Sequence, residues 1–207
     1  MTKRQHNAIM RAVFTAASDT NRNPMLEQMR AVKWERRGQR VIATDGYRIH
    51  IAHPIEGINL PSGVYVPPTD SDNRDDWPAG FLQKWARARS LKFPDWRSVM
   101  PNPEATTPVS VNVADAIYRL EEIPYPEGGD MGRLVYASCD DGVWGPEQDR
   151  CGHSRRDRVR DAFLLMQAAG VKTAKQWIPA NGRGGVLLKG TGLVKVAAVW
   201  LSKKKGV

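Results

Sequence analysis

Hydrophobic side chains recur at helical spacing in four segments of the chain, and each of these segments is predicted to be a helix. The predicted helices span residues 3–18, 78–90, 114–122 and 157–169. In the first of them Ile9, Val13 and Ala17 lie four residues apart and therefore share one face. Thr2 is placed to cap the first helix, and Gly170 is typical of a residue that ends a helix.

Shorter segments with alternating apolar and polar residues, bounded by turn residues, predict strands. These strands span residues 31–35, 40–52 (two strands joined by a turn), 62–66, 109–113, 133–139, 173–178, 186–189 and 193–201. Residues 144–154 show no regular pattern and are predicted to be irregular. Each half of the chain mixes helices with antiparallel strands, which predicts an α+β fold and suggests a repeat of roughly 100 residues.

A proline-rich stretch divides the two halves. Pro101, Pro103 and Pro108 lie in a segment that is poor in apolar residues, as is typical of a domain boundary. We therefore expect two domains, residues 1–102 and residues 103–207.

The chain is basic, with 31 Lys and Arg against 22 Asp and Glu in 207 residues and a formal net charge of +9. A basic excess of this kind favours nucleic acid as the partner, although a soluble basic protein without such a partner is the alternative. The sequence has no apolar run of about 18 residues that could span a membrane. Its N-terminus lacks the apolar core of a signal peptide, so an intracellular, cytoplasmic location is expected.

Several cations cluster on the predicted helices, where they form candidate contacts to DNA. Arg4 and Arg11 are seven residues apart and share a helix face. The full set of DNA-binding candidates is Arg4, Arg11, Lys84, Arg87, Arg89, Arg155 and Arg158. Cations at a helix N-terminus, such as the last two, oppose the helix dipole, which points to an outside partner. The alternative is a solvated basic face.

Catalytic and metal-binding patterns are not found. Cys139 and Cys151 are the only cysteines, and with His153 they do not complete a tetrahedral zinc site. His50 and His53 are three apart on a predicted strand, so their side chains point to opposite sides. No Glu-x-Lys or Asp-x-Lys sequence is present to complete a nuclease metal site. We therefore predict that the protein is not an enzyme and uses no cofactor or metal.

The segment 41–52 is predicted to be a hairpin with its turn at Asp45-Gly46, because glycine reaches positive φ without strain. After the turn, alternation places Tyr47, Ile49 and Ile51 on one face and Arg48, His50 and Ala52 on the other.

Two segments resemble one known family. Residues 43–50 read Ala-Thr-Asp-Gly-Tyr-Arg-Ile-His and are similar to the Ala-Thr-Asp-Gly-His-Arg-Leu-Ala signature of the bacterial β sliding clamp. Residues 93–101, Phe-Pro-Asp-Trp-Arg-Ser-Val-Met-Pro, resemble that family's Phe-Pro-Asp-Tyr-Arg-Arg-Val-x-Pro. The resemblance covers residues 5–101 and is faint beyond them. The second half of the first domain is shortened relative to the family, and the family's own first domain has no counterpart.

The resemblance implies two clamp-like domains per chain, the first similar to the family's second domain and the other to its third. It also implies a processivity factor, encoded by a phage or mobile element, that encircles duplex DNA and tethers polymerase and clamp-loader peptides. A ring of six domains would require a homo-oligomer, a trimer for preference, with a dimer as the other option. The second reading is a monomeric clamp-fold protein that binds DNA or regulates the replication machinery, and the third is a basic nuclease.

The same resemblance implies a peptide-binding pocket, because in the family these two segments and the C-terminal strand form its walls. Carried over by position, the pocket residues are Thr44, Gly46, Tyr47, Arg48, Ile49, Pro94 and Val99, with Trp200 at the rim. The alternative is that these positions are ordinary hairpin core.

Overall fold

The computed structural model describes residues 2–17, 27–53, 55–66, 85–98, 100, 107–124, 134–138, 143–146, 152–179, 184–190 and 194–201. Within this part of the chain the secondary structure is α+β, with helices on one side of antiparallel sheets. Lys84, Val99, Cys139, Cys151 and residues 78–84 of the second predicted helix lie outside the described residues.

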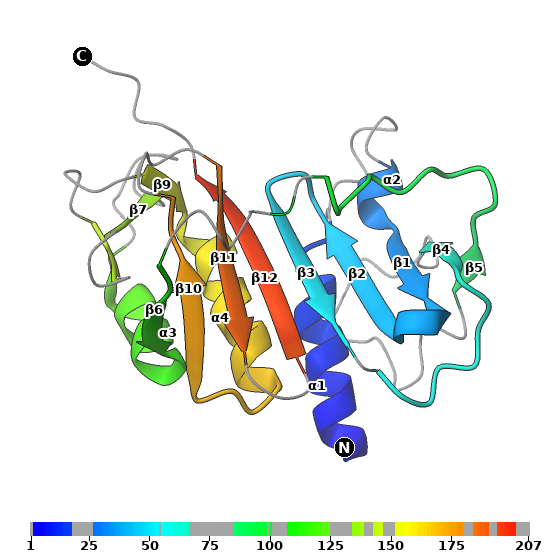
Figure 1. Cartoon of the computed structure of the whole chain (residues 1–207), viewed down its shortest axis with the longest axis horizontal. Coiled ribbons are helices and arrows are strands. Elements are labelled where there is room, and N and C mark those ends of the chain that lie inside the picture. The colour runs from blue at the N-terminus through cyan, green and yellow to red at the C-terminus, as the bar shows by residue number, and fades with distance from the viewer. Residues whose placement is uncertain are drawn as a thin grey trace.

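A nine-stranded sheet runs through both halves of the molecule (Figure 1). Its strands are, in spatial order, β5 (Ala86–Arg87), β4 (Gly63–Val66), β1 (Val32–Glu35), β2 (Arg40–Thr44), β3 (Arg48–Ala52), β12 (Val194–Leu201), β11 (Gly184–Gly190), β10 (Thr173–Trp177) and β6 (Val109–Asn112). All pairings in this sheet are antiparallel. The central pairing, between β3 and β12, joins the N-terminal half to the C-terminal half.

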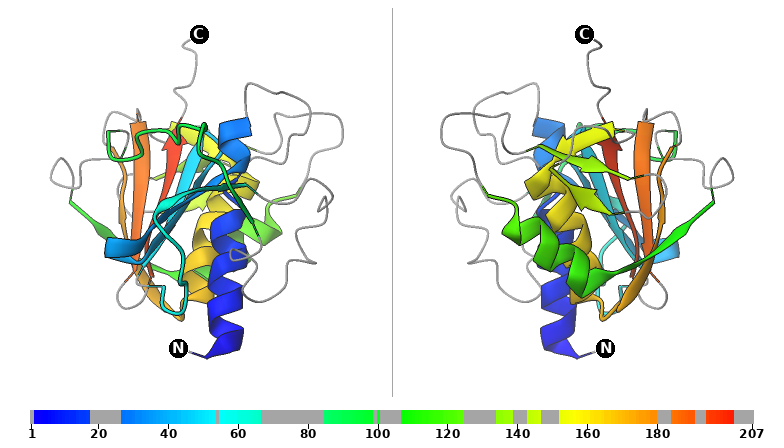
Figure 2. Two further views of the ribbon diagram at one scale, coloured as in Figure 1. Left: turned by 90° about the vertical axis from the view of Figure 1, so that its right-hand side faces the viewer. Right: turned by 90° about the vertical axis from the view of Figure 1, so that its left-hand side faces the viewer.

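The helices lie together on one face of this sheet (Figure 2). They are α1 (Lys3–Phe14), α2 (Glu27–Arg30), α3 (Val113–Glu122) and α4 (Arg156–Ala168), and a 3-10 turn, η2 (Arg36–Gly38), links β1 to β2. A smaller sheet with the order β8 (Trp144–Gly145), β7 (Leu134–Ala137) and β9 (Gly152–Arg155) precedes α4. Residues 144–154 are thus not entirely irregular, because β8 and the start of β9 pair with β7.

The first predicted helix is confirmed as α1, although it ends earlier than the sequence pattern suggests. The Thr2 hydroxyl accepts a hydrogen bond from the backbone N–H of Gln5 at 3.2 Å, which is the expected N-cap. The predicted hairpin is also confirmed, with residues 45–47 between β2 and β3 and Gly46 at φ +86°. Asp45 Oδ1 accepts hydrogen bonds from the N–H groups of Tyr47 and Arg48 and so holds the turn closed.

The second predicted helix is wrong over residues 85–90. In the structure Ala86 and Arg87 form β5, which pairs with β4 through Tyr65 and Val66. Trp85 packs its ring against Phe14, with 4.8 Å between the ring centroids, and is buried in the main core. A helical spacing of apolar residues does not reveal a tertiary strand pairing of this kind.

The same unit of one helix and three antiparallel strands occurs twice. Helix α1 precedes β1, β2 and β3, and helix α4 precedes β10, β11 and β12. In the sheet the two units meet at their last strands, so that the order is β1-β2-β3 followed by β12-β11-β10. The two helices are antiparallel. Arg48 contacts both Thr15 at the C-terminal end of α1 and Asp161 in the first half of α4, while Gly170, after α4, lies close to Gln5 in the first turn of α1. An approximate two-fold axis therefore passes between β3 and β12.

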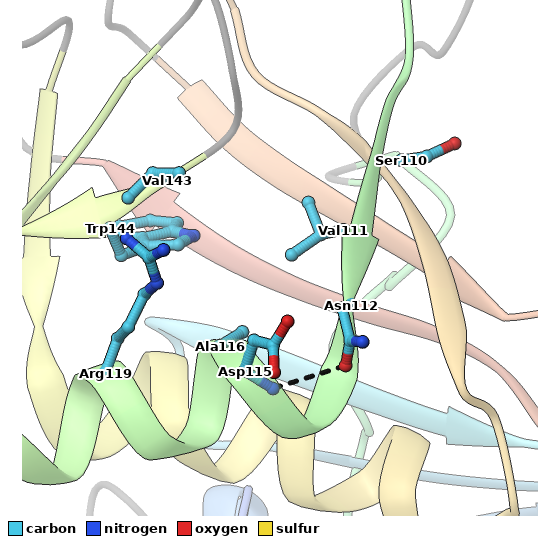
Figure 3. Close-up of a pocket in the computed structure, with 8 residues that line it drawn as sticks. All are labelled: Ser110, Val111, Asn112, Asp115, Ala116, Arg119, Val143 and Trp144. Atoms are coloured by element: carbon cyan, nitrogen blue, oxygen red, sulfur yellow. Dashed lines mark hydrogen bonds between the residues drawn. The ribbon is translucent and has the colours of Figure 1, made fainter.

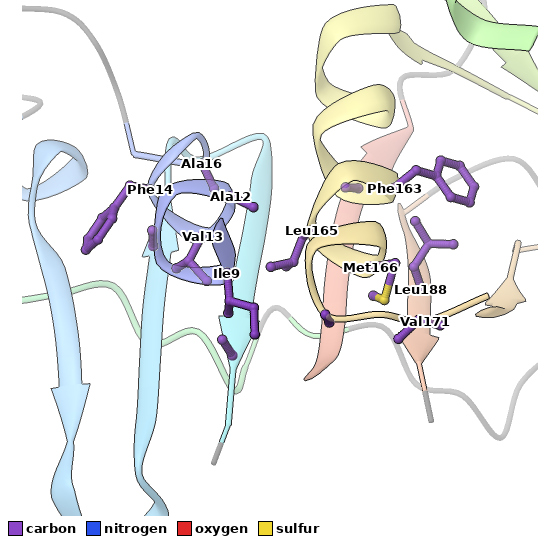
Figure 4. Close-up of a cluster of buried hydrophobic side chains, with 14 of the residues drawn as sticks. Ile9, Ala12, Val13, Phe14, Ala16, Phe163, Leu165, Met166, Val171 and Leu188 are labelled. Carbon is purple, nitrogen blue, oxygen red and sulfur yellow. The ribbon is translucent and has the colours of Figure 1, made fainter. Parts of the chain in front are cut away.

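The main hydrophobic core fills the space between the sheet and the helices. Figure 4 shows side chains of α1 and α4, including Ile9, Val13 and Leu165, gathered where the two helices approach each other. Leu188 of β11 and Met166 of α4 extend this core under the C-terminal half. One continuous core thus links both repeats of the helix-and-three-strand unit.

A second, smaller apolar cluster covers the opposite, outer face of the sheet. Ile42, Ile49, Ile51 and Leu187 form its floor, and Trp96 lies on them. Trp96 belongs to the segment that follows β5, so this segment crosses the outer face of the sheet. Alternation along β3 is therefore confirmed for its strand residues, since Ile49 and Ile51 face outward while Ala52 belongs to the main core.

His50, on the helix-facing side of β3, is completely buried, and its Nδ1 lies 2.7 Å from the Ala12 carbonyl oxygen in α1. Burial, together with the charge of Arg48, lowers the pKa of His50 to about 3, although the hydrogen bond with the Ala12 carbonyl opposes this shift. The imidazole is therefore neutral in the folded protein at neutral pH and donates Nδ1–H to the helix.

Replacing Leu165 with Ala should lower the free energy of unfolding by about 2–5 kcal/mol, because it leaves a cavity between α1 and α4. Urea denaturation followed by circular dichroism measures the loss. Gln167→Ala, at an exposed position of the same helix, is the matched control and should change the stability little. A loss below about 1 kcal/mol for Leu165→Ala would contradict the proposed packing of the two helices.

Acidification should destabilise the protein through His50. The folded pKa lies below the unfolded value of about 6.5, so the unfolded chain binds the proton first and stability falls as the pH drops below 6.5. Between pH 7.5 and pH 5.5 this one group should cost about 1.4 kcal/mol. Urea denaturation of wild type and His50→Gln at both pH values isolates the effect, which the variant should lack. Equal pH dependence in the two proteins would show that His50 is not buried as a neutral group.

Candidate nucleic-acid interface

The exposed face of α1 carries cations. Arg4, Ala8 and Arg11 are all exposed and lie at spacings of four and three residues, which places them in one row along the helix. Ile9 and Val13, on the opposite side, are buried in the main core. The row therefore faces away from the sheet, on the helical layer of the molecule.

The arginines at the start of α4 are engaged within the protein instead. Arg156 is buried and donates a hydrogen bond to the Ile123 carbonyl oxygen, and Arg155 forms an ion pair with Asp157 at 3.3 Å. Arg160 is paired with Glu121 of α3 at 2.6 Å. The unfavourable position of these cations at a helix N-terminus is thus offset by partners in the same chain.

Arg158 lies over the ring of Tyr47, with 4.0 Å between its Cζ and the ring centroid. Burial lowers the pKa of Arg158, and the charge of Asp45 partly opposes this shift. Tyr47 is 57% exposed, so the contact is a cation–π pair at the surface, where the β2–β3 turn meets α4.

Arg87 and Arg89 lie elsewhere, at the β5 edge of the large sheet. Arg87 donates a hydrogen bond to the Ser62 carbonyl oxygen at 2.7 Å, and both side chains are exposed. Among the described DNA-binding candidates, α1 supplies Arg4 and Arg11, α4 and its N-cap supply Arg155 and Arg158, and the sheet edge supplies Arg87 and Arg89. The first two pairs belong to the helical layer, where α1 and α4 pack together, whereas Arg87 and Arg89 lie apart from them at the sheet edge.

The positions of the expected peptide pocket are divided between the two faces of the sheet. Ile49 and the segment containing Pro94 lie on the outer face, beside Trp96. Arg48 and Tyr47 point toward the helices, where they contact Asp161 and Arg158. This departs from the expectation that Tyr47 shares a face with Ile49, because Tyr47 belongs to the turn and not to β3.

Other members of this set have structural roles or are not fully described. The Thr44 hydroxyl donates to the Arg48 carbonyl oxygen at 2.7 Å and accepts from the N–H of Gly46 at 3.1 Å. Trp200 pairs with Gly185 through the backbone of β12, and its side chain lies outside the described part of the structure.

Arg48 connects three elements at the centre of the molecule. Its guanidinium forms ion pairs with Asp45 at 3.2 Å and with Asp161 of α4, and it donates a hydrogen bond to the Thr15 carbonyl oxygen after α1. Burial raises the pKa of Asp161, while the charge of Arg48 lowers it. No local pattern identifies Asp161 as a partner of Arg48, because 113 residues separate the two.

Glu35 holds the segment that crosses the outer face. It accepts hydrogen bonds from the indole of Trp96 at 3.3 Å and from Arg97 at 2.8 Å. Burial acts to raise the pKa of Glu35, but the hydrogen bonds from Arg97 and Trp96 give a net lowering. Arg97 also lies over the Trp96 ring, 4.3 Å from its centroid. No local pattern marks Glu35 as a functional residue, because it lies on β1, far along the chain from both partners.

No cluster of three or more His, Cys, Asp or Glu side chains able to hold a metal ion occurs among the described residues. In the same part of the chain, the helices are too short or too polar to cross a membrane.

Neither a protein-family model nor a curated protein sequence matches this chain. The structure, however, is similar to solved DNA polymerase III beta subunits. The beta chain of Streptococcus pneumoniae aligns with 99% of this chain at a TM-score of 0.67 and 14% identity, and that of Thermotoga maritima aligns with 99% at 0.65 and 14%. The C. crescentus beta sliding clamp aligns with 99% of this chain at 0.68 and 11% identity.

These alignments span 64% of the S. pneumoniae chain, 65% of the T. maritima chain and 64% of the C. crescentus chain. At such low identity the similarity establishes the fold, which agrees with the resemblance of residues 43–50 and 93–101 to sliding-clamp sequences. The chain has the fold of the bacterial DNA polymerase III beta subunit, in a divergent form.

Proposed function

We propose that this chain is a non-enzymatic, sliding-clamp-like protein that binds duplex DNA without sequence preference and tethers replication proteins to it. The shared fold supports this proposal, and so does the net charge of +9. Contacts from arginine and lysine to phosphate carry no sequence information, which suits a protein that moves along DNA.

The observation that carries the proposal is the cationic row on α1. Arg4 and Arg11 are exposed on the helical layer, and the short Ala8 between them allows a close approach to a phosphate backbone. The arginines of α4 are engaged within the chain, so the proposal assigns α1 the larger share of the electrostatic contact.

Reversing both charges of the row, in Arg4→Glu with Arg11→Glu, should weaken binding to duplex DNA and make it less dependent on salt. Each phosphate contact contributes about 0.9 to the slope of log affinity against log salt, so the slope should become shallower by up to about 2. Fluorescence anisotropy with labelled duplexes of unrelated sequence, at several salt concentrations, measures both effects.

The matched control is Lys175→Glu with Lys189→Glu, which makes the same change in net charge at exposed positions of β10 and β11, on the outer face of the sheet. This control should lose only the small affinity due to overall charge. If the two double variants weaken binding equally, the interaction is non-specific attraction and α1 does not form the interface.

The proposal includes closure of a ring by several copies, with a trimer preferred and a dimer as the other option. One chain corresponds to less than two thirds of the length of a beta subunit. A closed ring of six domains therefore needs more than one copy of this chain. The alternative is a monomeric clamp-fold protein that binds DNA or regulates replication. This alternative applies if copies of the chain do not associate into a ring.

Light scattering of the purified protein at micromolar concentration should give about three times 23.1 kDa. A ring should also be retained on circular DNA and lost when the DNA is cut, because its hold is topological. A mass of 23.1 kDa at every concentration would exclude the ring and leave the monomeric alternative.

Capture of polymerase or clamp-loader peptides near the β2–β3 turn belongs to the same proposal. A peptide on the outer face would meet the partly exposed Phe93 and Pro94, because Ile49 is already buried under Trp96. Tyr47 and Arg48 are approached from the helical layer. A partner that binds here would therefore use one face of the hairpin, and the outer face offers the apolar contacts.

A further inference from the structure

Two cavities lie at opposite ends of the described strand order in the large sheet. The first, of about 150 Å³, lies between β6, helix α3 and β8, and Asp115 and Arg119 at its rim carry opposite charges (Figure 3). The second, of about 260 Å³, lies beside β4 and β5. It is lined by Gly63, Val64, Arg87, Ala88, Arg89 and Leu91. The second cavity thus carries charge of one sign, which makes it selective for a ligand of the opposite sign.

The guanidinium of Arg87 is fixed at this cavity by the protein itself. It donates a hydrogen bond to the Ser62 carbonyl oxygen at 2.7 Å, and the Ser62 hydroxyl in turn accepts one from the backbone N–H of Arg36 at 2.9 Å. Gly63 leaves the necessary room, because a side chain there would place its Cβ only 2.7 Å from Arg87 Nε. The bond to Ser62 uses one of the five N–H groups of the guanidinium, so most of its donors remain for a ligand.

No carboxylate balances the two arginines within the part of the chain that the structure describes. Arg87 and Arg89 are both exposed, and neither forms an ion pair with a described Asp or Glu. Glu35, on the strand next to β4, is already paired with three other cations. Two like charges at one cavity repel each other, and an anion placed between them relieves this repulsion.

The rest of the lining indicates what kind of anion fits. Val64, Ala88 and Leu91 are aliphatic and half-buried. None of the described residues that line the cavity is aromatic, so they offer no ring on which a nucleic-acid base could stack. The volume is below the roughly 300–1,000 Å³ of small-molecule pockets and suits one or two side chains of a peptide. A carboxylate beside an aliphatic side chain therefore matches this cavity better than a nucleic-acid strand does.

We propose that this cavity docks an acidic segment of a partner protein. A Glu or Asp carboxylate of the segment accepts hydrogen bonds from Arg87 and Arg89, since a planar guanidinium can donate two parallel bonds to a carboxylate. A neighbouring Leu, Ile or Val of the segment packs on Leu91. That the partner is a tethered replication protein rests on the proposed function, whereas the site itself does not. It is a docking place separate from the β2–β3 turn, where Trp96 already covers Ile49.

The test uses short fluorescent peptides with a Gly-Ser background, each carrying one Glu and one Leu at varied spacing. Anisotropy measures their affinity for the whole protein. At least one spacing should bind, and Arg87→Gln with Arg89→Gln should weaken it about tenfold or more, because charge-assisted hydrogen bonds are lost. Gly63→Ala should also weaken it, without any change in charge, because the added Cβ displaces the Arg87 guanidinium. The matched control is Lys175→Gln with Lys189→Gln, which removes the same charge from exposed positions of β10 and β11 and should change the affinity little.

Binding of duplex DNA by the same variants separates this proposal from the proposed function. Arg87→Gln with Arg89→Gln should bind duplex DNA nearly as wild type does, and Arg4→Glu with Arg11→Glu should bind the peptide nearly as wild type does. Circular dichroism checks that each variant is folded. If no peptide of the series binds, or if the control pair weakens binding as much as the arginine pair, the proposal is wrong. If the arginine pair loses duplex DNA while peptide binding is unaffected, the cavity belongs to the DNA interface and the proposal is equally wrong.

Discussion

The antiparallel pairing of β3 with β12 is the contact on which the rest of the structure depends. It joins two units of one helix and three strands into one sheet and fixes their approximate two-fold relation. With β3 and β12 side by side, α1 and α4 are brought together on the same face, and their apolar side chains form a common core. The pairing also makes the outer face continuous, so that Ile49 of one unit and Leu187 of the other lie under Trp96.

The ion pair between Arg48 and Asp161 at this junction is largely shielded from water, so each charge depends on its partner for stabilisation. Arg48 is only 11% exposed in its side chain, and Asp161 is 19% exposed. Loss of one partner of such a pair leaves a desolvated charge, at a typical cost of about 3–5 kcal/mol, whereas replacing both with apolar groups can be neutral. Arg48 and His50 both connect β3 to α1, through the carbonyl groups of Thr15 and Ala12. Arg48 and His50, both in the clamp-like segment 43–50, therefore have structural roles at or beside the junction between the two units.

Local patterns predicted much of this fold and less of the candidate site. The α1 stripe, the Asp45-Gly46 turn and the alternation of Ile49 and Ile51 were all readable, because each depends on neighbours within a few residues. The spacing of apolar residues predicts a helix where Ala86 and Arg87 form a strand, because the pairing of this strand with β4 is a tertiary contact. Strand alternation predicts that Tyr47 shares a face with Ile49, but it does not apply to Tyr47, which lies in the turn before β3.

The arginines illustrate why the site was harder to predict than the fold. Charge spacing identified exposed Arg4 and Arg11 correctly as a single row on one helix. It could not distinguish them from Arg158, whose contact with the Tyr47 ring joins α4 to the β2–β3 turn, far apart in the chain. The cavity between β6, α3 and β8 has no local signature in the sequence, because it arises from the meeting of three separate segments.

The position of β12 in the chain has a consequence for folding during synthesis. About 140 residues separate β3 from the strand that covers its edge, so this pairing has a high contact order and should form late. Until β12 has been made, the emerging N-terminal unit exposes the edge of β3 and the apolar side of α1 that later packs on α4. A nascent chain of this kind is vulnerable to pairing with other strands. Its yield in cells should consequently depend on protection of that edge during translation as well as on the stability of the finished fold.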